Sequence, residues 1–265
     1  RSRTPIHEVF SSIQGEGLFV GEPQVFVRLS GCPLRCSWCD TPETWGMPPA
    51  AREGADWQAG LTRSWCSTEE VALQVESLDP TGSKAISVTG GEPLMWPEFI
   101  AELRTRFPNR RLHLETAGAF PRSLSRVLGS VDHVSADLKL PRDLEAPVEL
   151  AHSSGRVGQY SFESAPADAE AWAVDRRAVL QLLVGRDACL KLVLAGTRSV
   201  ADYHVLLADV QELAPELPLF LQPATATRSV PAPEAKLVEE VTLEAEKRGL
   251  AVRVLPQLHV LLGMR

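Results

Sequence analysis

The chain has 265 residues, a formal net charge of -7, 44% hydrophobic residues and 23% charged residues. These values are ordinary for a globular protein with a buried core. The negative charge argues against a broad basic surface that would hold nucleic acid or anionic lipid, so we expect a small-molecule ligand.

The charge thus predicts no nucleic-acid partner, and two further properties of the chain predict a cytoplasmic protein with no membrane partner. It contains no run of about eighteen apolar residues, and its first residues, RSRTPIHEVF, lack the apolar core of a secretory signal. The five cysteines are an odd number in a long chain, which fits reduced thiols better than a disulfide framework.

The first predicted strand, residues 24–29, is an apolar run that follows a glycine-rich stretch, QGEGLFVGEP. Residues 42–66 are rich in Pro, Gly and Ala and show no sustained period, so we expect a loop there. Ser67 and Glu70 have the spacing of a capping box, which predicts a helix start before the next strand.

Strands and helices then alternate along most of the chain, which predicts an α/β fold with parallel strands and crossover helices. We expect strands at 85–89, 111–116, 132–140, 189–194, 217–223 and 251–256, and helices at 97–107, 122–128, 199–213 and 233–248. Residues 141–187 interrupt the alternation, and the last third of them has a helical pattern. We expect one domain over 1–265, with insertions near 42–66 and 141–187.

Polar motifs follow the ends of several predicted strands. They are the cysteine cluster, TGGEP, ETAG, SADLK and QPATAT. In α/β barrels the catalytic residues lie at the carboxyl ends of the strands. The sequence therefore predicts that these motifs share one site.

Three of the five cysteines, Cys32, Cys36 and Cys39, lie within eight residues. Their spacing lets three thiolates bind one inorganic centre from a single loop. A structural zinc site normally has four protein ligands, so zinc would need His7 or His113 as well, whereas a 4Fe-4S cluster held by three cysteines keeps one iron open. We expect Cys66 and Cys189 to be ordinary buried thiols.

The cysteine motif, with Trp38 before its last cysteine, resembles that of the radical S-adenosylmethionine (SAM) superfamily, and TGGEP resembles its glycine-rich SAM segment. The resemblance implies a partial or modified TIM-like barrel of six β/α units, a 4Fe-4S cluster on the three cysteines, and SAM on the open iron. The residues expected at SAM are Ser37, Trp38, Cys39, Gly90, Gly91, Glu92, Ser135, Ala136, Asp137, Gln222, Pro223, Ala224 and Thr225. The family named in the next paragraph often has the sequence Ser-Pro-Lys at the third of these SAM segments. This chain has Ser135, Ala136 and Asp137 there instead. Either Asp137 or Lys139 is the candidate replacement for the missing lysine.

The segments EVFSSIQGEG, VFVRLSGCPLRCSWCDT, ETAG, LQP and VLPQLHVLLG together resemble the 7-carboxy-7-deazaguanine synthase family. That family converts 6-carboxy-5,6,7,8-tetrahydropterin to 7-carboxy-7-deazaguanine and ammonia. The resemblance implies Mg²⁺ on Thr41, a low-potential electron donor such as flavodoxin or ferredoxin, and a homodimer. It also implies that an apolar C-terminal tail anchors the last residue at the substrate. The residues expected at the substrate are Ile13, Gln14, Gly15, Arg28, Thr89, Glu115 and Arg265.

Two other functions remain open on the sequence alone. A glycyl-radical activating enzyme would share the cysteine spacing but not the QGEG and CDT segments. A non-enzymatic Fe-S or zinc module would leave the TGGEP motif and the polar strand ends without a function.

Overall fold

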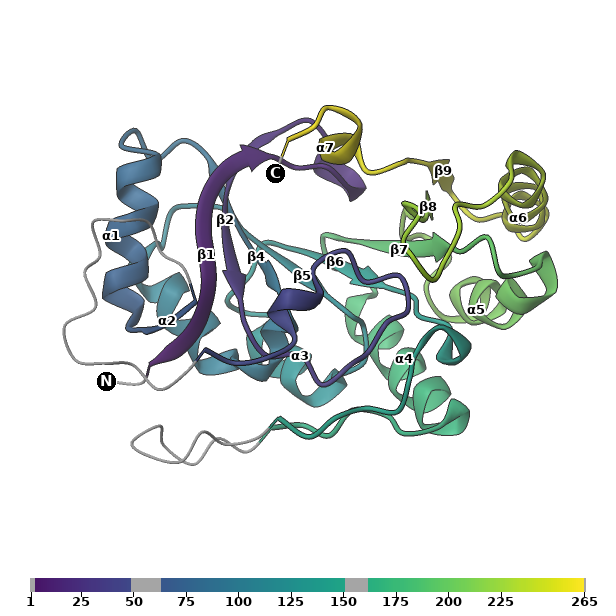
Figure 1. The fold of residues 1–265 in the computed structure, drawn as a ribbon, viewed down its shortest axis with the longest axis horizontal. Helices are drawn as coiled ribbons and strands as arrows, with labels where there is room; N and C mark the ends of the chain where they lie inside the picture. The colour runs from purple at the N-terminus through teal and green to yellow at the C-terminus, as the bar shows by residue number, and fades with distance from the viewer. Residues whose placement is uncertain (1–2, 49–62, 151–161, 265) are drawn as a thin grey trace.

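A computed structural model describes residues 3–48, 63–150 and 162–264 as a nine-stranded sheet with helices packed on it (Figure 1). The strands are β1 (Thr4–Ile13), β2 (Pro23–Leu29), β3 (Ser64–Cys66), β4 (Ala85–Gly90), β5 (Leu112–Thr116), β6 (His133–Asp137), β7 (Ala188–Leu194), β8 (Leu219–Pro223) and β9 (Val252–Val254). The helices are α1 (Thr68–Leu78), α2 (Pro97–Arg106), α3 (Pro121–Val127), α4 (Ala169–Leu183), α5 (Val200–Leu213), α6 (Ala235–Lys247) and α7 (Leu258–Leu261).

The sheet is open at both edges, with the strand order β3-β1-β2-β4-β5-β6-β7-β8-β9. From β2 to β9 every neighbouring pair is parallel and the strands follow chain order. The predicted α/β fold with parallel strands is therefore confirmed, and the expected barrel is a partial one. Because each crossover steps in the same direction, the helices α1 to α6 lie around the outside of the sheet (Figure 1).

Two strands at the beginning of the sheet were not predicted. β1 pairs antiparallel with β2, and the glycine-rich stretch between them forms the hairpin connection, closed by Gln14 N to Glu22 O at 2.8 Å and Gly21 N to Gln14 O at 2.7 Å. β3 pairs antiparallel with β1 and lies at the end of the segment that was predicted to be a loop. Residues 24–29 are thus the second strand of the molecule, and the first of its parallel strands.

The expected helices are confirmed, with ends that differ by a few residues. The Ser67 capping box is present, because its side chain accepts from Glu70 N while Glu70 accepts from Ser67 N. Ser199 forms the same arrangement with Asp202 at the start of α5. The last third of the 141–187 insertion forms α4, as its periodicity predicts.

The hydrophobic core lies between the sheet and the surrounding helices, and β7 is buried along its whole length. Strands covered on both faces are expected to be continuous apolar runs, as β7 is apart from one lysine. Among the described residues, no helix is long and apolar enough to cross a membrane.

Candidate active site

A cavity of about 190 Å³ opens at the carboxyl ends of the parallel strands. Its walls come from the β1–β2 hairpin, the cysteine loop after β2, the ends of β4 to β8, and the C-terminal segment. The sheet brings together most of the residues predicted to form the site. Those that line the cavity are Ile13, Gln14, Gly15, Arg28, Cys32, Cys36, Trp38, Cys39, Thr41, Thr89, Gly90, Gly91, Glu115, Asp137, Gln222, Ala224 and Thr225.

The cysteine loop is fixed by contacts of its own. Arg35 Nη1 donates to Cys32 O at 2.7 Å and to Leu34 O at 2.8 Å, and its guanidinium lies 4.8 Å from the centre of the Trp45 ring. A bridge between Cys36 and Leu144 ties the loop to the second insertion. The three thiols are therefore held at the cavity before any ligand arrives.

The chemistry of the three thiols fits an inorganic cluster better than a single ion. All three line the same cavity, yet the group of three metal-binding side chains that converges within 4.8 Å in the described part of the chain contains none of them. A four-iron cluster takes each cysteine on a different iron, which suits thiols that are spread around a cavity. Neither His7 nor His113 lies in the cavity wall, so the fourth ligand that zinc needs is not supplied by them.

Burial raises the pKa of the Cys36 thiol to about 11, and it raises the pKa of Cys32 and of Cys39 as well. The nearby Lys139 ammonium acts in the opposite direction on all three thiols. The thiols are therefore protonated in the free protein at neutral pH, and binding a metal centre would release their protons.

The two glycines of the TGGEP segment are required by the protein itself. A Cβ on Gly90, whose φ is +117°, would lie 2.3 Å from the Leu29 backbone. A Cβ on Gly91 would lie 2.5 Å from Gly31 O. The sequence suggested that these glycines allow a ligand to approach the backbone, and the structure shows that they also allow β4 to pass close to the cysteine loop.

Glu92 lies behind the cavity wall and does not line it. The carboxylate is fully buried and accepts from Leu94 N at 3.0 Å, Thr116 Oγ1 at 2.8 Å and Ala117 N at 2.8 Å. Burial raises its pKa to about 7, although these three donors favour the ionised form. The structure therefore gives Glu92 a structural role, in which it fixes the loops after β4 and β5.

Other residues predicted to contact SAM also lie outside the cavity wall: Ser37 is exposed, Ser135 and Ala136 are buried in β6, and Pro223 ends β8. Asp137 at the end of β6 does reach the cavity, and Lys139 lines it too. Lys139 Nζ donates to Asp137 Oδ2 at 2.8 Å and lies 4.4 Å from the centre of the Trp38 ring. Arg265 lies outside the described residues.

The predicted substrate residues Gln14, Thr89 and Glu115 form a polar frame around the Glu115 carboxylate. Its Oε1 accepts from Gln14 Nε2 at 2.8 Å and from Ser87 Oγ at 3.1 Å, and its Oε2 accepts from Thr89 Oγ1 at 3.2 Å. Arg28 stands beside this frame, 3.1 Å from Glu8 Oε1 and 5.2 Å from the centre of the Phe10 ring. The frame offers amide, hydroxyl and carboxylate groups, and Arg28, the neighbour of Thr89 across the β2–β4 pair, adds a guanidinium.

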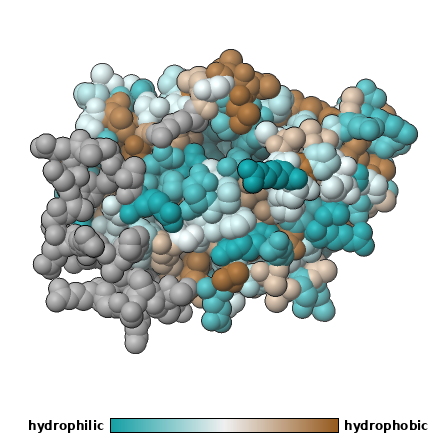
Figure 2. Space-filling view, in the orientation of Figure 1, coloured by the Kyte–Doolittle hydropathy of each residue, from teal (hydrophilic) through white to brown (hydrophobic). Residues whose placement is uncertain are grey.

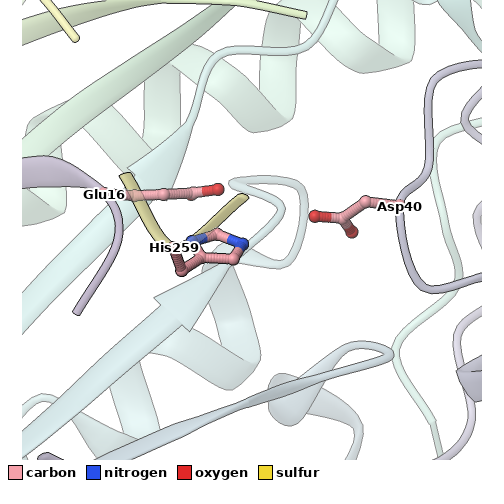
Figure 3. Close-up of side chains that lie close together, drawn as sticks. All are labelled: Glu16, Asp40 and His259. Carbon is pink, nitrogen blue, oxygen red and sulfur yellow. The ribbon is translucent and has the colours of Figure 1, made fainter. Parts of the chain in front are cut away.

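A second polar group joins the cysteine loop to the C-terminal segment. Glu16, Asp40 and His259 place their side-chain ligand atoms within 4.8 Å of one another, and Figure 3 shows the two carboxylates pointing toward each other with the histidine ring beside the space between them. Gln257 Nε2 donates to Glu16 Oε1 at 2.7 Å and to Asp40 Oδ2 at 2.9 Å. Thr41 Oγ1 donates to Asp40 Oδ1 at 3.2 Å, so hydroxyl and carboxylate oxygens suited to a hard cation lie together here.

The C-terminal segment is held at the site in a different way from the one predicted. The side chains expected to act as apolar anchors are exposed, Leu261 by 68% and Leu262 by 57%, and Figure 2 shows hydrophobic surface over α7. The anchors are polar: Leu258 N donates to Gly15 O at 3.0 Å, and Gln257 is buried among the contacts given above. A Cβ on Gly15 would lie 1.8 Å from His259 Nδ1, so this glycine allows the close approach.

Sequence reasoning missed several residues that line the cavity, including Glu16, Asp40, Lys191, Gln257 and His259. Four of them stand inside or beside motifs that were already singled out. Lys191 had a signal of its own, because it is the one charged residue in an otherwise apolar strand pattern. A lysine in such a position must be paired, and so marks a charged partner nearby.

The sequence matches the family model described as the radical SAM superfamily over residues 26–163, which is more than half of the chain. The 7-carboxy-7-deazaguanine synthase of Methanothermobacter thermautotrophicus is 35% identical, and the match covers 99% of this chain and 98% of that protein. The enzyme of the same name from Methanopyrus kandleri is 33% identical over 97% of this chain and 92% of that protein.

The chain belongs to the 7-carboxy-7-deazaguanine synthase family. It is a radical SAM enzyme by the same findings, and the glycyl-radical activating function and the non-enzymatic module are not supported. The family implies a 4Fe-4S cluster and SAM, which the thiols at the cavity suit.

Two solved structures support the fold alone. The crystal structure of QueE from Escherichia coli has a TM-score of 0.58 and 22% identity, covering 97% of this chain and 95% of that one. A radical SAM methyltransferase from Sphaerobacter thermophilus has a TM-score of 0.59 and 14% identity, covering 94% of this chain and 77% of that one.

Proposed function

We propose that the chain converts 6-carboxy-5,6,7,8-tetrahydropterin to 7-carboxy-7-deazaguanine and ammonia, in a pathway to 7-deazapurines. The observation that carries the proposal is the shared cavity: the three clustered thiols and the residues Gln14, Thr89 and Glu115 line the same 190 Å³ space. A single cavity lined both by thiols for a redox centre and by polar groups for a heterocycle suits radical chemistry on a pterin.

In this proposal Cys32, Cys36 and Cys39 hold the 4Fe-4S cluster, and SAM lies between the cluster and the ends of β4, β6 and β8. When bound, the cluster and SAM supply the radical that removes a hydrogen atom from the substrate. The protein positions the two ligands and excludes water. Lys139, rather than Asp137, takes the place of the family's lysine, because its ammonium is the cation beside the three thiols.

The Glu115 frame is proposed to bind the pyrimidinone and amine edge of the pterin. Gln14 and Thr89 already place their donors on Glu115, so the carboxylate has a fixed direction. Arg28 is proposed to hold the substrate carboxylate, since a guanidinium offers two parallel N–H donors. With Ile13, Gly15 and Arg265, these residues make up the proposed substrate site.

A magnesium ion is proposed at Thr41. The Thr41 hydroxyl and the Asp40 carboxylate lie together, and the substrate carboxylate and waters would supply the other oxygen ligands that Mg²⁺ requires. The ion would neutralise charge on the substrate as its ring rearranges.

Four further proposals concern the context of the enzyme. One domain carries the whole reaction, because the elements around the cavity come from one sheet. A low-potential donor such as flavodoxin or ferredoxin supplies the electron, the chain acts as a homodimer, and it works in the cytoplasm. The last is supported by five cysteines that form no disulfide.

The test is an anaerobic turnover assay with mass detection of the deazapurine acid. The reconstituted protein is incubated with the tetrahydropterin, SAM, dithionite and Mg²⁺, and we expect product and ammonia in equal amounts. No product from a preparation that holds its cluster and binds SAM would contradict the proposed substrate.

The magnesium proposal has its own test in the same assay. Thr41→Ala should lower the rate of turnover sharply, and full activity of the wild-type protein in EDTA would remove the proposed role of Mg²⁺.

A further inference from the structure

Lys191 is a charged residue on a strand where every residue is buried. It lies in the middle of β7, and only 7% of its surface is exposed. Its Nζ lies 2.6 Å from Glu16 Oε2 and 3.3 Å from Asp137 Oδ1. The ammonium therefore stands between two carboxylates, one from the β1–β2 hairpin and one from the end of β6.

These contacts continue from Asp137 to a second lysine, which makes a row of alternating charges. Asp137 Oδ2 accepts from Lys139 Nζ at 2.8 Å, and Lys139 in turn lies over the Trp38 ring in the cysteine loop. The row thus links the hairpin to the cysteine loop, and all four of its residues line the cavity: Glu16, Lys191, Asp137 and Lys139. The row contains two positive and two negative groups, so its net charge is zero. Each buried charge is compensated only while it keeps its neighbour of opposite sign.

The row is ionised throughout. Burial alone would lower the pKa of Lys191, but Asp137 and Glu16 outweigh burial and raise it well above its usual range. Burial would likewise raise the pKa of Asp137 and of Glu16, but the neighbouring lysines hold both below their usual range. Each charge is therefore kept in place by its neighbours, and a change at one end alters the partners available at the other.

Glu16, at the other end of the row, lines the same cavity beside the proposed substrate residues Gln14 and Gly15, and its backbone N donates to Gln14 Oε1 at 3.1 Å. Besides Lys191, it accepts from Gln222 Nε2 at 3.1 Å and from Gln257 Nε2 at 2.7 Å, both on Oε1. Its Oε2 accepts from Lys191 Nζ at 2.6 Å. The strength of the Lys191 contact therefore decides how much of the Glu16 charge is left for a donor on the substrate.

We propose that this row couples the binding of SAM to the binding of the pterin, with Lys191 as the positioning residue. This rests on the proposed function. When the anionic end of SAM takes Lys139 as a partner, Asp137 loses part of its compensation and draws Lys191 toward itself. Glu16 then loses part of its own compensation, and its carboxylate binds the N–H donors of the pterin more strongly. The coupling is therefore positive. By linkage, each ligand raises the affinity of the protein for the other ligand by the same factor.

The experiment measures SAM binding by anaerobic equilibrium dialysis on the cluster-loaded full chain, with and without saturating pterin. No reductant is added, so neither ligand reacts. We expect the wild-type Kd for SAM to fall by at least about fivefold when the pterin is present, the lower end of ordinary coupling between sites. In Lys191→Met the ratio of the two Kd values should fall to about one, and Lys191→Arg, which keeps the charge, should restore part of it.

Two further variants separate coupling from folding. Lys84→Met is the matched control, because Lys84 is a partly exposed lysine bonded to Ser11 Oγ at 2.8 Å outside the cavity wall, and it should keep the wild-type ratio. If Lys191→Met loses its cluster or fails to fold, the double variant Glu16→Gln/Lys191→Met replaces it in the experiment. This variant removes two neighbouring opposite charges together, so it should fold, and its ratio of the two Kd values for SAM should be about one. An unchanged ratio in whichever variant folds would refute the proposal.

Failure of the coupling is distinguishable from failure of the proposed function. The wild-type preparation is first tested for turnover with reductant. A protein that turns over the pterin but binds SAM equally well with and without it refutes the coupling alone. A protein that binds SAM but neither binds nor turns over the pterin refutes both.

Discussion

Two groups of buried ion pairs in the described part of the chain differ in what surrounds them. The row from Glu16 to Lys139 lines the cavity, where a ligand can reach it. The other group joins α4 to α5 on the outside of the sheet, where Arg176 Nε donates to Asp209 Oδ2 at 2.8 Å. Arg176 is 5% exposed and Asp209 is 7% exposed, and neither lines the cavity.

The difference shows why a buried charge alone does not mark a functional site. In the α4–α5 pair all the partners are supplied by the protein, and Arg177 adds a second contact to Asp209 at 2.6 Å. Its charges can contribute only to stability. In the cavity row each charge also faces space that a charged ligand can enter, so the same kind of contact can respond to binding.

The largest expected effect comes from removing a thiol on the cavity side. Cys36→Ala should lose measurable turnover, because a 4Fe-4S cluster held by two cysteines would lack the third protein ligand. Iron analysis and optical spectra after anaerobic reconstitution should show a depleted cluster. Cys66→Ala is the matched control: Cys66 is buried in β3, away from the cavity wall, and the variant should keep both cluster and turnover. Equal loss in the two variants would contradict the assignment.

The next largest effect is expected on the structural side. Arg176→Met should lower the free energy of unfolding by about 3–5 kcal/mol, because it leaves the buried Asp209 carboxylate without its main partner. Denaturant unfolding measures the loss. The Kd for SAM at a temperature where the variant is folded should be unchanged, and a weaker affinity there would mean that the two groups of charges are not independent. Arg177→Met, at a more exposed position, should cost less.

Most of the fold could be predicted from the sequence because its parallel strands are buried on both faces and read as continuous apolar runs. β1 escaped because its pattern, TPIHEVFSSI, mixes polar residues into an antiparallel strand. β3 has three residues, too few for a period to be visible. The open sheet could not be deduced from the alternation of elements, which is the same in a closed barrel.

The site was predicted where a motif marks it and missed where the contact is long-range. The cysteines, Gln14 and Thr41 stand in recognisable segments, and all reach the cavity. Lys191 and Glu16 are 175 residues apart, so no local pattern pairs them. Glu92 shows the opposite error: it stands within a motif, but its carboxylate serves the loops behind the cavity.

The smallest predicted effect is on the pH dependence of stability, and it concerns a buried side chain that carries no charge. It adds a buried neutral group to the comparison of the two groups of buried charges. His113 is 3% exposed, stacks on Phe19 at 4.4 Å between ring centres, and its Nδ1 lies 3.1 Å from Gln24 Nε2. Burial, with the nearby His133 and Arg111, lowers its pKa to about 4. The folded protein therefore keeps this imidazole neutral at pH values where the unfolded chain is protonated.

The sign of the pH effect follows from proton binding. Between pH 6.5 and 4 the unfolded state binds more protons at this position than the folded state does, so the contribution of His113 to stability falls as the pH is lowered through that window. The loss should reach about 3 kcal/mol near pH 4. His113→Phe keeps a ring against Phe19, so the difference in unfolding free energy between wild type and variant should shift by this amount across the window. A wild-type curve parallel to that of His113→Phe would mean that burial does not keep this ring neutral, and the distinction between charged and uncharged buried groups would fail at this position.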